Sequence, residues 1–183
     1  FQEVELFLRW YVPKFYNGDE KKKINKLLKK NIKSLIKKIK LPNKTFVHRD
    51  FHVSNLIFNK KKISIIDTQD ALYGNPAYDL ASLVDDVRLK TDNKMKSLIY
   101  DYFLKKQKKY DNEEFKNDFN ILSVLRNLKI IGIFSRLSKR DNKNKYLKFI
   151  PYAWKLIKYR TKDNKDFVEL NSIFKKYFSK KFK

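Results

Sequence analysis

Apolar residues recur every three or four positions along most of the chain, which is the spacing of an α-helix. The clearest early example lies over residues 24–39, where lysines occupy most of the opposite face. This pattern predicts a long amphipathic helix packed on a core. A shorter run over residues 3–11 predicts another helix that ends near Pro13, and residues 17–19 provide a turn with helix-capping side chains.

Further helices are predicted after residue 74. Asn75 and Pro76 supply an N-cap and first-turn pair for the first of them, which is expected to extend to about Leu89. Apolar side chains at helical spacing predict the others, over residues 95–103, 115–131, 153–157 and 167–178. Their aromatic residues are expected in the core rather than in a stacking platform for bases, because they follow the helical repeat.

A different pattern occupies residues 45–66, where short β-prone runs are separated by polar residues. Thr45–Val47, Leu56–Phe58 and Ile63–Ile66 are expected to be strands. The polar turn Asn59–Lys62 joins the last two strands into a hairpin. The predicted fold class is therefore α+β, mostly α, with one small β-hairpin at its active edge.

Residues 48–55 read H-R-D-F-H-V-S-N, which matches the H-R-D-x-x-x-x-N pattern of kinase catalytic loops. Phosphoryl transfer requires a carboxylate that orients and deprotonates the attacking hydroxyl, and hard oxygen ligands that hold Mg²⁺ on the phosphates. Asp50 fits the first role. Asn55 and Asp67 fit the second, because the predicted hairpin returns Asp67 close to Asn55 although twelve residues separate them.

Three segments indicate which family of kinases the sequence resembles. They are F-V-H-R-D-F-H at residues 46–52, I-D-T-Q-D-A at 66–71 and L-K-I-I-G-I-F-S-R-L at 128–137. The D-F-G and A-P-E motifs of protein kinases are absent from the sequence. These segments resemble the aminoglycoside phosphotransferase and choline kinase superfamily. Within it, they are most similar to the bacterial N-acetylmuramate/N-acetylglucosamine kinases, which act on an anomeric hydroxyl in cell-wall recycling. The likeness covers most of residues 1–160.

The resemblance implies a protein-kinase-like C-terminal lobe that uses ATP and Mg²⁺, with a catalytic loop at residues 46–58 and a metal-binding segment at 63–71. It also implies roles for eight residues. Asp50 is expected to be the base, Asn55 and Asp67 to bind Mg²⁺ with its nucleotide, and His48 and Arg49 to form the loop framework. The candidates for structural or substrate contacts are His52, Asp70 and Asp79. Asp79 is expected to brace the loop and Asp70 to face a sugar. Thr68 departs from the family, which usually has an aromatic residue there.

The sequence contains no G-x-G-x-x-G or P-loop motif, and its three glycines cannot form a glycine-rich loop over phosphates. Members of the family that this sequence resembles carry an N-terminal nucleotide-binding lobe, and this lobe is expected to be absent here. Residues 1–183 are therefore predicted to be a single C-terminal lobe that is inactive alone and whose partners are a sugar and the missing lobe. The face around residues 48–55 is expected to expose apolar surface where that lobe would close.

Composition excludes several other classes of protein. The net charge of +24 could attract nucleic acid, but it comes from 37 lysines and only seven arginines, and nucleic-acid sites favour arginine. Solvated lysine faces, in a sequence rich in residues with A/T-rich codons, are the preferred interpretation. The absence of cysteine fits a cytoplasmic enzyme, two histidines make a zinc site implausible, and no apolar run is long enough to span a membrane.

Three hypotheses follow. The first is the catalytic lobe of a kinase for a cell-wall amino sugar. The second is a related kinase for choline, an aminoglycoside or another small alcohol, which substrate profiling would distinguish. The third is a non-catalytic basic module, in which the kinase loop is a relic. The presence of all three of Asp50, Asn55 and Asp67 argues against this last hypothesis.

Overall fold

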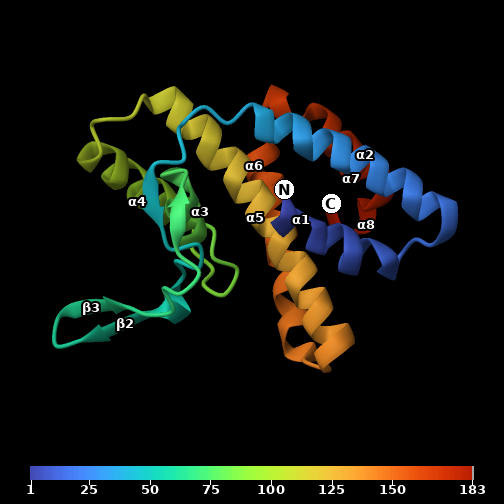
Figure 1. Cartoon of the computed structure of the whole chain (residues 1–183), viewed down its shortest axis with the longest axis horizontal. Helices are drawn as coiled ribbons and strands as arrows, with labels where there is room; N and C mark the ends of the chain where they lie inside the picture. The colour runs from blue at the N-terminus through green and yellow to red at the C-terminus, as the bar shows by residue number, and fades with distance from the viewer. Residues whose placement is uncertain (183) are drawn as a thin grey trace. The chain divides into compact units, whose positions relative to one another are not determined.

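The computed structural model describes residues 1–182, and these are mostly helical with two small antiparallel strand pairs (Figure 1). The predicted α+β, mostly α fold class is confirmed. Contacts between Cα atoms divide the chain into two compact units, one made of Phe1–Lys38 with the residues from Val124 onward, the other of Ile39–Ser123. The expectation of a single lobe stays a prediction. No helix among the described residues is long and apolar enough to cross a membrane.

The strands belong to the unit of residues 39–123. Strand β1 (Thr45–Val47) pairs antiparallel with β4 (Leu72–Gly74), and β2 (Leu56–Asn59) pairs antiparallel with β3 (Lys62–Ile65). The predicted hairpin is thus confirmed, with Leu56 opposite Ile65. It extends away from β1, β4 and the neighbouring helices of its unit (Figure 1). Strand β4 was not expected, because three residues carry too short a pattern and their partner strand lies far away in the sequence.

Helix α3 (Ala77–Val84) differs from the prediction at both ends. Pro76 occupies the N-cap position rather than the first helical one, although the Asn75 side chain does accept a hydrogen bond from the Ala77 N–H at 3.0 Å. The helix ends at Val84, not at Leu89. The next residue, Asp85, has non-helical backbone geometry, with φ −108° and ψ 38°.

Helices α4 (Asn93–Lys106) and α5 (Asn112–Asp141) complete this unit, α5 continuing beyond it. The core lies between α3 and the first turns of α5, and its buried residues are Leu41, Ala77, Leu80, Ala81, Val84, Phe115, Phe119 and Leu122. Asp118, on α5 between Phe115 and Phe119, carries a fully buried carboxylate. It accepts hydrogen bonds from the backbone N–H groups of Lys40 and Leu41, both at 2.8 Å, and from the Asn75 side chain at 2.7 Å.

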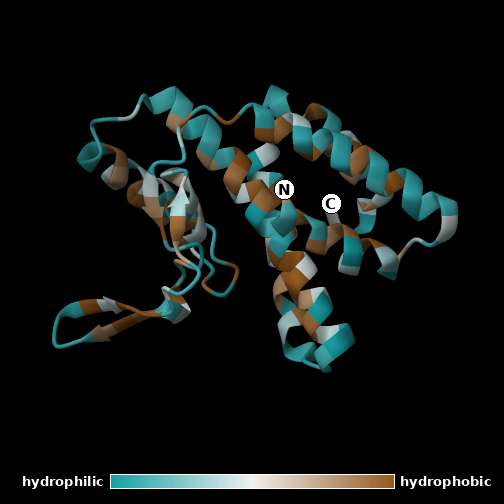
Figure 2. Ribbon diagram, viewed as in Figure 1, coloured by the Kyte–Doolittle hydropathy of each residue, from teal (hydrophilic) through white to brown (hydrophobic). Residues whose placement is uncertain are grey.

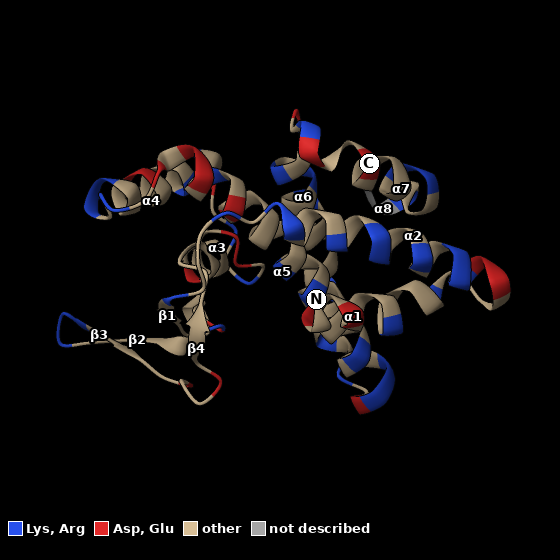
Figure 3. Cartoon of the chain, turned by 45° about the horizontal axis from the view of Figure 1, so that its top comes forward, with Lys and Arg blue, Asp and Glu red and all other residues tan. Residues whose placement is uncertain are grey.

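The other unit is entirely helical within the described residues. Its N-terminal part is α1 (Gln2–Leu6), a π-helical turn η1 (Phe7–Tyr11), a 3-10 turn η2 (Val12–Lys14) and the long α2 (Gly18–Lys37). The predicted helices near residues 3–11 and 24–39 are therefore confirmed. Lysines recur along much of the length of α2, as the blue segments of its ribbon show (Figure 3).

After α5 this unit continues through 3-10 turns and short helices. They are η4 (Asn144–Phe149), α6 (Ile150–Thr161), η5 (Lys165–Phe167), α7 (Val168–Tyr177) and α8 (Ser179–Phe182). The aromatic residues form a packed core, as predicted. The Trp154 ring meets Phe174 edge-on at 5.1 Å and its Nε1 donates a hydrogen bond to the Tyr11 hydroxyl at 3.0 Å.

Gly132 on α5 marks the closest packing in this unit. A Cβ atom at this position would collide with the backbone of Leu6 and Phe7. Only glycine lets α5 and the N-terminal helix approach this closely.

Candidate active site

The segment from His48 to Asn55 leaves β1 and enters β2, and its first residues are held by a carboxylate on α3. The two oxygens of Asp79 accept hydrogen bonds from the backbone N–H of His48 at 2.7 Å and of Arg49 at 3.0 Å. Charge-assisted bonds of this kind are stronger than those between neutral groups. They hold Arg49 in the left-handed region, at φ 71°, a strained conformation for a residue with a side chain.

The buried His48 ring connects the loop to the end of the hairpin. Its Nε2 lies 2.9 Å from the carbonyl oxygen of Ile66, and since a carbonyl only accepts, Nε2 carries the proton. Ile66 in turn donates its backbone N–H to the Asn55 carbonyl at 3.1 Å. Asp67 follows immediately and also has a positive φ, of 70°. The hairpin thus returns the chain to Asn55 at the residue before Asp67.

Asn55 and Asp50 are bonded to each other within the loop. The buried Asn55 side chain donates from Nδ2 to the Asp50 carbonyl oxygen at 2.9 Å. The same carbonyl accepts the backbone N–H of His52 at 3.0 Å. Because the amide nitrogen of Asn55 is committed to Asp50, its amide oxygen is the atom suited to a metal.

The remaining predicted residues differ in their exposure. Asp67 and Asp70 are both exposed, and the Asp67 carboxylate accepts a hydrogen bond from the Gln69 side chain. The Arg49 guanidinium donates to the backbone oxygen of Asp70 at 3.3 Å. The His52 side chain, in contrast, is buried. The proposed contact of Asp70 with a sugar stays a prediction.

The donor set suits a cation that is bound together with a phosphate. No group of three or more His, Cys, Asp or Glu side chains that could hold a metal occurs among residues 1–182. One amide oxygen from Asn55 and one carboxylate from Asp67 form a hard but sparse set. Mg²⁺ fits it, because this ion normally keeps several waters and takes further oxygens from substrate phosphates.

Apolar side chains are exposed around this loop, as predicted. Tyr73 is 77% exposed and Phe46 62% exposed on the paired strands β4 and β1. On the hairpin and just after it the exposed apolar residues are Ile57, Phe58, Ile63, Ile65 and Ile66. Figure 2 shows the hydrophobic residues along both hairpin strands. A face of this kind marks a site that another surface or ligand covers.

Two buried carboxylates next to the site were not predicted. Asp85 and Asp86 follow α3 directly, and Asp86 accepts the backbone N–H of Val53 at 3.2 Å. The available signal was the pair of adjacent aspartates at a helix end. Sequence pattern alone did not distinguish them from the many exposed charged residues of this chain.

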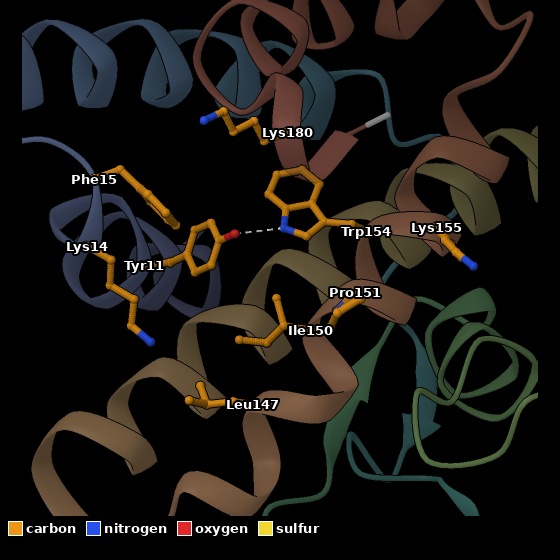
Figure 4. A pocket seen from close by; sticks show the side chains of 9 residues that line it. All are labelled: Tyr11, Lys14, Phe15, Leu147, Ile150, Pro151, Trp154, Lys155 and Lys180. Atoms are coloured by element: carbon orange, nitrogen blue, oxygen red, sulfur yellow. Dashed lines mark hydrogen bonds between the residues drawn. The ribbon is translucent and has the colours of Figure 1, made fainter.

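A pocket of about 440 Å³ lies in the helical unit, and none of the candidate site residues lines it (Figure 4). Its walls include the rings of Tyr11, Phe15 and Trp154, and Lys14 lies at its edge. Burial raises the pKa of Tyr11 to about 12. Burial, and secondarily repulsion from Lys139, lowers the pKa of the Lys14 ammonium.

A loop of the H-R-D-x-x-x-x-N type, braced by a helix carboxylate and followed by a hairpin that returns an aspartate to it, defines the kinase-like class of phosphotransferases. Comparison with known families agrees. The Phosphotransferase enzyme family matches residues 2–130, and the chain belongs to this family.

Several curated relatives are named N-acetylmuramate/N-acetylglucosamine kinase. The protein from Neisseria meningitidis is 32% identical over 181 residues, covering 94% of this chain and 53% of its own length. The protein from Caulobacter vibrioides is 34% identical over 114 residues, covering 60% of this chain and 31% of its own. The one from Pseudomonas putida is 30% identical over 156 residues, with 82% and 46% covered. The chain thus spans about half the length of these relatives or less.

Proposed function

We propose that this chain forms the catalytic half of an ATP-dependent kinase that phosphorylates the anomeric hydroxyl of N-acetylmuramate or N-acetylglucosamine. Family membership and the names of the relatives support this substrate class. The observation that carries the proposal is the Asp50 loop, which is held by Asp79 at one end and by the Asn55 side chain at the other. A cytoplasmic role in cell-wall recycling is part of the same proposal.

Asp50 is the proposed general base. Its carboxylate orients the sugar hydroxyl and accepts its proton as the phosphoryl group is transferred. Little covalent chemistry is asked of the protein in such a reaction, so positioning dominates. His48 and Arg49 serve as framework, since their backbone N–H groups fix the loop on Asp79.

Asn55 and Asp67 are the proposed holders of Mg²⁺. Together with ATP they would hold the ion where it would supply positive charge to the phosphate oxygens. The bond from Asn55 to the Asp50 carbonyl ties the metal ligand to the base, so both keep one geometry. The backbone bond from Ile66 to Asn55, which brings the residue before Asp67 to Asn55, supports the assignment of Asp67.

The phosphates of ATP require further donors, and the sequence has no glycine-rich loop that could cover them. We propose that a separate nucleotide-binding lobe supplies them, as the greater length of the relatives suggests. The exposed apolar residues around Phe46 and Tyr73 are the surface on which such a lobe would close.

The test is product analysis with the chain joined to an N-terminal nucleotide-binding lobe. ATP with N-acetylglucosamine or N-acetylmuramate should give the sugar 1-phosphate, identified by phosphorus NMR. Choline and an aminoglycoside, assayed in parallel, should be poor acceptors. A 6-phosphate product would contradict the regiochemistry, and turnover of choline alone would favour the second kinase hypothesis. Residues 1–183 alone should be inactive, and supplying the lobe in trans should restore turnover.

A further inference from the structure

Two adjacent carboxylates lie directly after helix α3, and both are buried. Asp85 is 0% exposed and Asp86 is 1% exposed. Burying a carboxylate costs several kcal/mol unless it is paired and hydrogen-bonded, so both require partners. Their partners lie in different places, and together they connect the helix end to the catalytic loop.

Asp86 is bonded to the second half of the loop. Its Oδ2 accepts the backbone N–H of Val53 at 3.2 Å. Its Oδ1 accepts the backbone N–H of Arg88 at 3.0 Å and the Arg88 guanidinium at 3.3 Å. Val53 begins the 3-10 turn η3 (Val53–Asn55), and this turn ends at the candidate metal ligand Asn55.

Asp85 fixes the position of its neighbour. The Lys96 ammonium on α4 lies 3.1 Å from the Asp85 carboxylate and also donates to the Val84 carbonyl at 2.5 Å. The Ser123 hydroxyl on α5 donates to the other Asp85 oxygen at 2.5 Å. Three helices therefore converge on Asp85, and Asp86 has little freedom to move away from Val53.

We propose that Asp86 is a positioning residue for the reaction. It holds the η3 turn so that Asn55 presents its amide oxygen to the metal. Asp79 holds the first half of the loop through His48 and Arg49, and Asp86 holds the second half through Val53. A loop strained at Arg49 needs constraint on both sides to persist. The kinetic part of this inference rests on the proposed function.

The first test needs no activity. Amide hydrogen exchange at Val53 should be at least about tenfold faster in Asp86→Asn than in the unsubstituted chain, because a bond to a charged acceptor is lost or weakened. An amide side chain has one acceptor oxygen, so it cannot serve both Val53 and Arg88. Exchange at Phe119, which is buried in the core of the same unit on α5, reports on unfolding of that unit and should not change. Asp101→Asn, an exposed aspartate on α4, is the matched control.

Arg88→Met separates the two contacts of Asp86, because it removes the guanidinium and keeps the carboxylate. Val53 should stay protected in this variant. Unchanged Val53 exchange in both Asp86→Asn and Asp86→Ala would overturn the inference, whatever the protein catalyses.

The second test uses the chain joined to a nucleotide-binding lobe. Asp86→Asn should raise the Mg²⁺ concentration for half-maximal activity and lower kcat by about tenfold, since small displacements of positioned groups have large effects. The KM for the sugar should stay within about twofold. A role in stability alone would lower Tm and the active fraction without changing the Mg²⁺ requirement, and that result would overturn the positioning role. If the unsubstituted protein shows no kinase activity, the proposed function fails, and Val53 exchange still decides whether Asp86 holds the loop.

Discussion

The Asn55 side chain donates a hydrogen bond to the backbone carbonyl of Asp50 at 2.9 Å. This bond joins the candidate metal ligand to the candidate base, which are five positions apart in the sequence. The positions of both side chains consequently depend on the same short stretch of backbone rather than on two independent elements. Substitutions in the loop are therefore expected to affect proton acceptance and metal binding together.

Replacement of the proposed base should remove most of the activity. Asp50→Asn keeps the shape of the side chain but loses the proton acceptor and its charge. With the nucleotide-binding lobe present, kcat should fall by at least about 10²-fold, the lower range for general-base contributions, with a modest change in KM. Steady-state kinetics with ATP and N-acetylglucosamine check this, with Asp101→Asn as the control. A variant with near-normal kcat would remove Asp50 from this role.

The proposed metal ligands should act only when nucleotide is present. Asp67→Ala should abolish activity, because one of two protein ligands is lost. Asn55→Asp should retain some, although a carboxylate oxygen replaces the amide nitrogen that faces the Asp50 carbonyl. Calorimetry should detect no tight Mg²⁺ binding to the isolated chain, and a chelator should abolish turnover reversibly. Tight binding without nucleotide would contradict the sparse site.

Loss of the buried Asp118 carboxylate should be strongly destabilising. Asp118→Ala leaves the N–H groups of Lys40 and Leu41 and the Asn75 amide without their acceptor. The free energy of unfolding should fall by about 3 kcal/mol or more. Asp111→Ala removes an exposed helix cap and should cost about 1 kcal/mol. Urea unfolding compares the two, and equal losses would show that Asp118 is not central to its unit.

Addition of one methyl group at Gly132 should destabilise the helical unit. The new Cβ would meet the backbone of Leu6 and Phe7, which cannot move aside as a flexible side chain can. Gly132→Ala should lower the free energy of unfolding by about 2 kcal/mol or more, despite the better helix propensity of alanine. Lys139→Ala, at an exposed position of the same helix, should change it by less than about 0.5 kcal/mol. Thermal unfolding provides the measurement.

Tyr11 should make stability fall in alkaline solution. Burial raises the pKa of Tyr11 to about 12, whereas an unfolded tyrosine has a pKa of about 10. Between these values the folded chain keeps the proton that the unfolded chain releases, so stability is unaffected below about pH 10 and falls as the pH rises further. The total effect is on the order of 2–3 kcal/mol.

Tyr11→Phe tests this linkage. The variant should lose stability at neutral pH, because the buried Trp154 Nε1 loses its acceptor. The difference in free energy of unfolding between the unsubstituted chain and the variant should then shrink above about pH 10. Lysine titration affects both proteins alike and cancels in the difference. A difference that stays constant with pH would show that Tyr11 ionises as freely in the folded chain as in the unfolded one.

Local sequence patterns predicted most helices and the hairpin, because helix and strand periodicity records which face is buried. The same patterns could not predict where α3 ends. That boundary is set at Asp85 by Lys96 and Ser123, which lie on other helices. Strand β4 likewise depends on its pairing with β1 rather than on its own three residues.

The sequence predicted those residues of the candidate site that lie close together in one short segment. Asp50, Asn55 and Asp67 follow from a motif and a hairpin. The roles of Asp86 and Asp118 depend on which backbone N–H groups the fold brings to them, Val53 for one and Lys40 with Leu41 for the other. No residue spacing encodes these contacts.

The β2–β3 hairpin also affects how the isolated chain behaves in solution. It is a two-stranded sheet with exposed apolar side chains, such as Phe58 at 73% exposure, so its strands can pair with another molecule. Lys60, Lys61 and Lys62 at its tip, together with the net charge of +24, oppose such pairing by repulsion. At about 1 M salt this repulsion is screened beyond about 3 Å. Concentrated salt should thus favour aggregation of this chain, and dilute buffer should keep it dispersed.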